Sequence, residues 1–147
     1  MVKWISFIVL SLLIASCDNG EVAEQAQEEV VDYAAQLEDT SWELVDIVVM
    51  GGYVFEPETP SDYTIRFRSE NRLTGKSDCN TLTGSWQVEE DLTISELNST
   101  RSMCIAGSLH NYFSLYLRDV VSMELAGESL TLRTTIEGVT LKFQPSA

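Results

Sequence analysis

Apolar and polar residues alternate along most of the chain after position 40, and this period of two limits the fold more than any other feature. The alternation is clearest in 63–68, 121–125 and 139–143. Successive side chains of a strand point to opposite faces, so these runs predict strands with one face in a core. Turn residues separate the runs at intervals of roughly ten residues, which is typical of an all-β sandwich or barrel. We therefore expect a mainly β domain.

The segment 108–121 breaks this rhythm and predicts one helix. Its apolar residues recur three and four positions apart and would share one face. These residues are Leu109, Tyr112, Phe113, Tyr116, Leu117, Val120 and Val121. Ser108 is the expected N-cap. About five strands should precede the helix and three should follow it, with the helix packed across the open side or end of the sheet.

The amino end has the layout of an export signal. Lys3 precedes an uncharged, mostly apolar run from Trp4 to Ala15. A membrane-spanning helix needs about 20 apolar residues, so this shorter run predicts a cleaved signal peptide, residues 1–16. Ile14-Ala15-Ser16-Cys17 resembles the bacterial lipobox, which implies that Cys17 is lipidated and becomes the first mature residue. Several acyl chains on one residue would anchor the protein stably.

An acidic stretch follows, with eight acidic and no basic residues between positions 18 and 39. Such a composition does not support a packed core, so residues 17–39 are predicted to be a solvated tether. A weak helical spacing leaves a partner-docking helix as the alternative. Residues 40–147 have the length of one domain and carry fifteen acidic and eight basic residues, a formal charge of −7. That balance, without a basic stripe, argues against nucleic acid as a partner.

The two remaining cysteines are Cys79 and Cys104. Export would place them in an oxidising compartment, so we expect a structural disulfide, with a redox-active or metal-binding thiol pair as the alternative. There is no Cys-x-x-Cys spacing, and one histidine, His110, does not complete a zinc site unaided. The chain also lacks the Gly-x-Ser-x-Gly turn of many serine hydrolases. We expect no catalytic residues, no metal and no cofactor.

Several short motifs occur in a characteristic order: 40–44, 73–75, 79–80, 82–86, 99–104, 130–132 and 141–143. Together they resemble the META domain family of HslJ-like bacterial proteins. The matching motif residues are Trp42, Gly75, Asn80, Gly84, Trp86, Thr100 and Met103. The resemblance implies a small antiparallel β-barrel-like fold with one helix packed on it, and a bond between the two cysteines. The resemblance implies neither a catalysed reaction nor a ligand. The chain departs from the family at Asp78, where glycine is common, and at 110–111, where glutamate is common.

These features favour an envelope lipoprotein on the periplasmic side of a bacterial membrane, with a monomeric, non-enzymatic domain that binds an envelope protein in a stress-related role. Asp18 resembles an inner-membrane retention signal, but that rule does not hold in every lineage, so the choice of membrane stays open. Two alternatives are a carrier of a small hydrophobic ligand in the barrel interior and an inhibitor of an envelope enzyme.

A cationic strip is either a candidate anion patch or a strand face that resists aggregation. It comprises Arg66, Arg68, Arg72 and Lys76.

Overall fold

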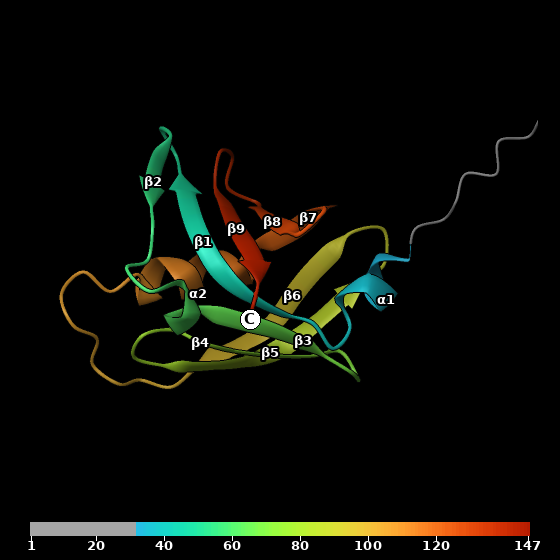
Figure 1. The fold of residues 1–147 in the computed structure, drawn as a ribbon, viewed down its shortest axis with the longest axis horizontal. Coiled ribbons are helices and arrows are strands. Elements are labelled where there is room, and N and C mark those ends of the chain that lie inside the picture. Colours follow the sequence, from blue (N-terminus) through green and yellow to red (C-terminus); the bar gives the residue numbers. More distant parts are fainter. Residues whose placement is uncertain (1–31) are drawn as a thin grey trace, which may run out of the picture. The chain divides into compact units, whose positions relative to one another are not determined.

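The computed structural model describes residues 32–147 (Figure 1). The predicted signal peptide, the predicted lipidation site Cys17 and most of the acidic stretch lie outside these residues. One antiparallel sheet contains all nine strands that the described residues form, in the order β6-β5-β4-β3-β1-β9-β8-β7, with the short β2 paired to β1. The strands are β1 (Ser41–Val49), β2 (Tyr53–Phe55), β3 (Thr64–Arg68), β4 (Arg72–Lys76), β5 (Thr81–Val88), β6 (Leu92–Ser99), β7 (Val120–Ala126), β8 (Ser129–Thr134) and β9 (Thr140–Pro145).

The sheet curls until its two edge strands meet, which makes it a nearly closed barrel. Strands β6 and β7 contact each other although no strand ladder joins them in the described residues. One side chain links the two edges at this point. Asp91, just before β6, accepts hydrogen bonds through Oδ1 from the backbone N–H of Leu92 and of Met123 in β7, both at 3.0 Å. The predicted mainly β, barrel-like class is confirmed.

Alternating residues fill the interior, as the period of two predicted. Phe67, Phe113 and Phe143 are fully buried, and Phe67 packs edge-on against Trp86 with ring centroids 5.3 Å apart. A buried indole N–H needs a hydrogen-bond acceptor, and the indole groups of Trp86 and Trp42 each have one. Trp86 Nε1 donates to the Arg68 carbonyl at 2.9 Å, and Trp42 Nε1 donates to Thr40 Oγ1 at 2.8 Å.

Two glycines of the family motif lie where strands approach each other too closely for a side chain. A β-carbon at Gly75 in β4 would lie 2.5 Å from the Thr64 carbonyl oxygen. A β-carbon at Gly84 in β5 would lie 2.9 Å from the Ser95 carbonyl oxygen. Gly84 also falls at the register shift between β5 and β6, so it accommodates the bulge that bends this pair.

The predicted helix is present but shorter than its apolar pattern suggested. Helix α2 spans His110–Arg118, and its N-cap residue is Leu109, not Ser108. Val120 and Val121 already belong to β7, as suits β-branched side chains. Helix α2 buries Phe113 and Leu117 and contacts β6.

Three further elements add to the predicted strands and single helix, and the first of them falls in the stretch whose helical spacing left a helix as the alternative. Helix α1 (Tyr33–Leu37) lies inside the stretch predicted as tether, and Leu37 is fully buried in the core, so the packed region begins before Thr40. A 3₁₀ helix, η1, covers Pro60–Asp62. Strand β2 makes six strands before α2 instead of about five. Within residues 32–147 no helix is long and apolar enough to cross a membrane.

Candidate functional site

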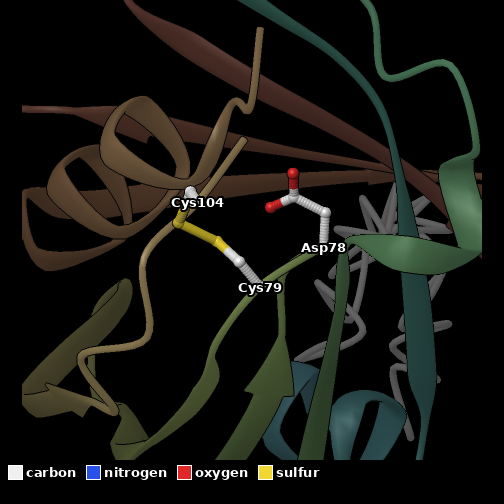
Figure 2. Close-up of side chains that lie close together, drawn as sticks. All are labelled: Asp78, Cys79 and Cys104. Carbon is white, nitrogen blue, oxygen red and sulfur yellow. A yellow bond between two sulfur atoms is a disulfide. The ribbon is translucent and has the colours of Figure 1, made fainter. Parts of the chain in front are cut away.

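A disulfide joins Cys79, in the turn between β4 and β5, to Cys104, in the coil that leads to α2 (Figure 2). The two residues are 25 positions apart, with Cα atoms 5.3 Å apart. Closing a loop of this length stabilises the fold by roughly 3–4 kcal/mol on the chain-entropy account. The bond fixes the coil 100–109 to the strands of the first half of the sheet.

The same corner contains a group of side chains with metal-ligand character. Oxygen of Asp78 and the sulfurs of Cys79 and Cys104 lie within 4.8 Å of one another. Both sulfurs are consumed by the disulfide, however, and a metal requires thiolates. The Asp78 carboxylate instead accepts a hydrogen bond from Ser108 Oγ at 2.8 Å. In this oxidised form the three side chains have a structural role and do not form a metal site.

Asn80 is the hydrogen-bonding hub of the corner, and only 5% of it is exposed. Its Oδ1 accepts from Ser102 N at 2.7 Å and from Thr100 Oγ1 at 2.8 Å. Its Nδ2 donates to the Ser102 carbonyl at 3.2 Å. The side chain therefore takes the place of a neighbouring strand for the segment around Ser102. Asn80 thus bonds backbone in a structural role.

His110, the first residue of α2, lies half-buried between two serines. Ser77 Oγ is 2.8 Å from Nδ1, and Ser99 Oγ is 3.4 Å from Nε2. Ser99 donates its own hydrogen to the Thr100 carbonyl at 2.7 Å, so its oxygen is free to accept from Nε2–H. The single hydroxyl hydrogen of Ser77 can go to Nδ1 or to the Asn80 carbonyl at 3.3 Å, so the contacts fit a neutral imidazole and do not fix its tautomer.

Burial lowers the pKa of His110 below its ordinary value of 6.5. The Asp78 carboxylate opposes this shift, and the Arg118 guanidinium adds to it. Nearby, burial raises the pKa of Tyr63, whose Oη accepts a hydrogen bond from Leu109 N at 2.8 Å and so holds the start of α2. Both groups are thus uncharged at neutral pH.

Ser77 and His110 resemble half of a hydrolytic triad, but the geometry lacks the other parts. Ser77 is buried, and its Oγ also accepts from Asn80 N at 3.1 Å. Among the described residues no carboxylate hydrogen-bonds His110; the nearby Asp78 is engaged with Ser108. A triad needs an accessible hydroxyl and a base that a third group orients. The pair is better described as part of the hydrogen-bonded corner.

An open hollow of about 540 Å³ lies between α2 and the segment 98–105. The polar face of α2 contributes His110, Ser114 and Arg118, which are four residues apart and so share one side of the helix. Asn98 and Arg101 line the opposite wall. The sequence interpretation missed this hollow, because its signal was only the four-residue spacing of polar groups on a helix selected for its apolar face.

The predicted cationic strip does lie together on one face. Arg66 and Arg68 of β3 share the outward side of the sheet with Arg72 and Lys76 of β4, and Arg68 pairs directly with Arg72 across the strands. Two of the four are engaged locally. Arg68 Nε donates to Thr74 Oγ1 at 3.2 Å, and Arg72 forms an ion pair with Glu70 at 3.4 Å. The strip is a charged outer face in the interior of the sheet, since neither β3 nor β4 is an edge strand.

The motif residues divide into interior and surface positions. Trp42 and Trp86 are buried, Gly75 and Gly84 allow close strand approach, and Asn80 and Thr100 join the segments of the disulfide corner. Met103 is the exception, since 97% of it is exposed. It lies one residue before Cys104, on a segment fixed at both sides. Nothing in its sequence context distinguished it from the core residues of the motif.

Known proteins share this fold and its motifs. A profile of the META domain matches residues 35–147. The chain is 28% identical over 146 residues to heat shock protein HslJ of Escherichia coli strain K12, covering 97% of this chain and 96% of that protein. An NMR structure of a protein from Burkholderia xenovorans superposes with a TM-score of 0.66 at 21% identity, covering 78% of this chain and 86% of the other.

A crystal structure of a DUF4847 family protein from Bacteroides vulgatus ATCC 8482 superposes with a TM-score of 0.57 at 16% identity, over 76% of this chain and 96% of the other. The two structural similarities establish the fold alone. The profile match covers most of the chain and includes the disulfide corner, both tryptophans and both close-approach glycines. The chain therefore belongs to the META domain family.

Proposed function

We propose that this chain is an exported lipoprotein, anchored in a bacterial envelope membrane through Cys17, whose META domain is a non-enzymatic module that binds an envelope protein in a stress-related role. The amino-terminal layout supports export and the lipobox-like motif supports the anchor. A disulfide in the domain is consistent with an oxidising compartment. The similarity to a protein named for heat shock supports the stress context.

The observation that carries the binding role is the segment 101–105. It exposes 97% of Met103 and 78% of Ile105, although both are large apolar residues. Asn80 holds one side of this segment by hydrogen bonds to Ser102, and the disulfide holds Cys104. Apolar side chains that are exposed on a fixed segment lose little entropy when a partner covers them. A binding loop is the role that this arrangement fits.

The same loop favours the inhibitor alternative over the carrier. A fixed, projecting segment next to a disulfide has the form that an enzyme cleft can accept, so an envelope enzyme is one class of partner. The interior offers the carrier no comparable support, because Phe67, Phe113, Phe143 and their neighbours fill it. Side chains commonly occupy the interior of barrels of this size.

The test places a photo-crosslinking amino acid at position 103 of the intact chain, expressed in bacterial cells. We expect a discrete protein adduct, with none from the same probe at Val121, which is exposed on β7. Cys79→Ser with Cys104→Ser should reduce the adduct, because the loop is then released. Equal adducts from positions 103 and 121, or none from position 103, would contradict the binding role.

The anchor has a separate test. Cys17→Ala should abolish incorporation of labelled fatty acid into the chain, while Cys104→Ala should leave it unchanged. Normal labelling of the Cys17→Ala chain would refute lipidation at this residue.

A further inference from the structure

We propose that the hollow between α2 and the segment 98–105 binds a phosphate group of a small molecule or lipid headgroup. This site is independent of the partner-binding role of the loop, although the two adjoin. It is built from Arg101, Arg118 and His110, together with the uncharged polar groups Asn98, Ser99 and Ser114.

The first support is charge. Among the described residues that line the hollow none is acidic, although residues 40–147 carry a formal charge of −7. Within residues 32–147 the guanidinium groups of Arg101 and Arg118 form no ion pair and no hydrogen bond, whereas Arg72 and Arg133 each pair with a glutamate. Two unpaired guanidinium groups on one concave surface attract an oxyanion and can each bind it through two parallel N–H groups.

The second support is the supply of neutral hydrogen-bond donors between the two arginines. Ser114 is buried, yet its hydroxyl meets only the Asn111 carbonyl, at 3.5 Å, the limit of a hydrogen bond. His110 presents its Nε2 side toward Ser99, at the wall of the hollow. A phosphate group has three or more acceptor oxygens, and the two guanidinium groups, the Ser114 hydroxyl and the second amide hydrogen of Asn98 offer donors that match them.

The third support is rigidity. The wall 98–105 is fixed because Asn80 bonds both Thr100 and Ser102 and because the disulfide holds Cys104. The opposite wall is a regular helix, tied at its start by Tyr63 through Leu109 N. A ligand would therefore enter a hollow that already exists and would spend little free energy on ordering it.

The size of the hollow indicates a ligand larger than an isolated ion. A volume of about 540 Å³ is within the range of small-molecule sites, so the phosphate would be one part of its ligand. Both a soluble phosphorylated compound and a phospholipid headgroup have this chemistry, and the experiment separates them.

His110 provides a built-in reporter. The charged groups that act on it are Asp78 of the β4–β5 turn and Arg118 of its own helix, with Arg101 on the facing wall. A bound phosphate adds negative charge beside the imidazole and favours its protonated form. Binding should therefore raise the pKa of His110 and should itself strengthen as the pH falls toward that pKa.

The experiment titrates the intact chain with inorganic phosphate at constant ionic strength and follows the single histidine by NMR. We expect saturable shifts of His110 and of amides in 98–105. Arg118→Gln should weaken binding by at least about tenfold, as expected for a hydrogen bond to a charged group. Arg66→Gln, which removes the same charge from the outer face of β3, should leave binding unchanged.

Two additions keep the test decisive. If Arg118→Gln lowers the thermal midpoint strongly, Arg118→Lys serves instead, since it keeps the charge and loses the planar fork, and it should weaken binding severalfold. Vesicles of phosphatidylglycerol in phosphatidylcholine form the second arm. Arg118-dependent vesicle binding would identify a headgroup, and phosphate binding without vesicle binding would identify a soluble ligand. Absence of a saturable His110 shift, or equal weakening by Arg66→Gln, would overturn the proposal.

Discussion

At the residue scale, the disulfide corner depends on groups that the sequence separates widely. The role of Asn80 could be predicted, because a polar residue beside a buried-prone cysteine at a strand bend needs backbone partners. The pairing of Ser77 with His110 could not, because 33 residues separate them and neither has a local pattern that points to the other. Arg101 and Arg118 could not be associated from the sequence either, because they line the same hollow only once α2 has packed against the sheet.

Asn80→Ala should lower the free energy of unfolding by about 2 kcal/mol, because Ser102 N and its carbonyl would lose their partners in a partly buried site. Asn98→Ala is the matched control, since Asn98 is exposed and makes one side-chain bond, to the Glu96 carbonyl. It should change stability by less than about 0.5 kcal/mol. Urea unfolding of both variants measures the difference, and equal midpoints would show that Asn80 is not a structural hub.

His110 should titrate with a pKa below 6.5, and as the single histidine it gives one assignable NMR signal. Since the folded-state pKa is lowered, the stability that this group contributes is fully present above the unfolded value, about 6.5, and is lost as pH falls through the folded-state pKa. His110→Gln removes the titration and should flatten the dependence of stability on pH in that window. A measured pKa above 6.5 in the absence of added phosphate would contradict the burial that lowers it.

At the element scale, the alternation of apolar residues placed the longer strands, and the helical spacing placed α2. The errors lie where a local pattern meets a tertiary constraint. Val120 and Val121 fit the apolar face of a helix, yet both lie in β7, where Val120 pairs with Thr134 of β8 and Val121 falls at the register shift. Strand β2 has only three residues, all outside the buried core, so it has no apolar alternation to detect.

Gly75→Ala should lower the free energy of unfolding by about 1–3 kcal/mol, because the new β-carbon would meet the backbone oxygen of Thr64 at 2.5 Å and the strands would have to separate. Lys76→Ala, on the neighbouring exposed position of β4, is the control and should be close to neutral. Thermal or urea unfolding gives the comparison. A neutral Gly75→Ala variant would mean that β3 and β4 are not so closely apposed.

At the scale of the whole domain, the period of two indicated a sandwich or a barrel without choosing between them, and only the resemblance to the META domain family implied the barrel. The choice depends on whether the first and second halves of the sheet meet at β6 and β7, and no local pattern encodes that contact. Asp91 belongs to an acidic turn that looks merely solvated in the sequence. In the fold its carboxylate reaches Met123, 32 residues away, and joins the two edges.

Asp91→Ala should loosen this closure and lower stability by about 1 kcal/mol, because the backbone N–H of Met123 loses its acceptor. Amide hydrogen exchange should accelerate at Met123 and along β6, while exchange in β1 and β9 stays slow. Asp91→Asn retains Oδ1 and should have the smaller effect. Unchanged exchange at Met123 in Asp91→Ala would show that the edges hold together without this side chain.

Strand β1 pairs with β9 in the middle of the sheet, where Figure 1 shows them side by side, and Ser146 N donates to the Ser41 carbonyl at 2.9 Å. A chain delivered amino end first therefore cannot complete its central ladder until its last strand has emerged. Pairing over such a sequence distance makes folding slow. Until then the first six strands have unpaired edges at β1 and β6, and these edges expose the folding chain to aggregation.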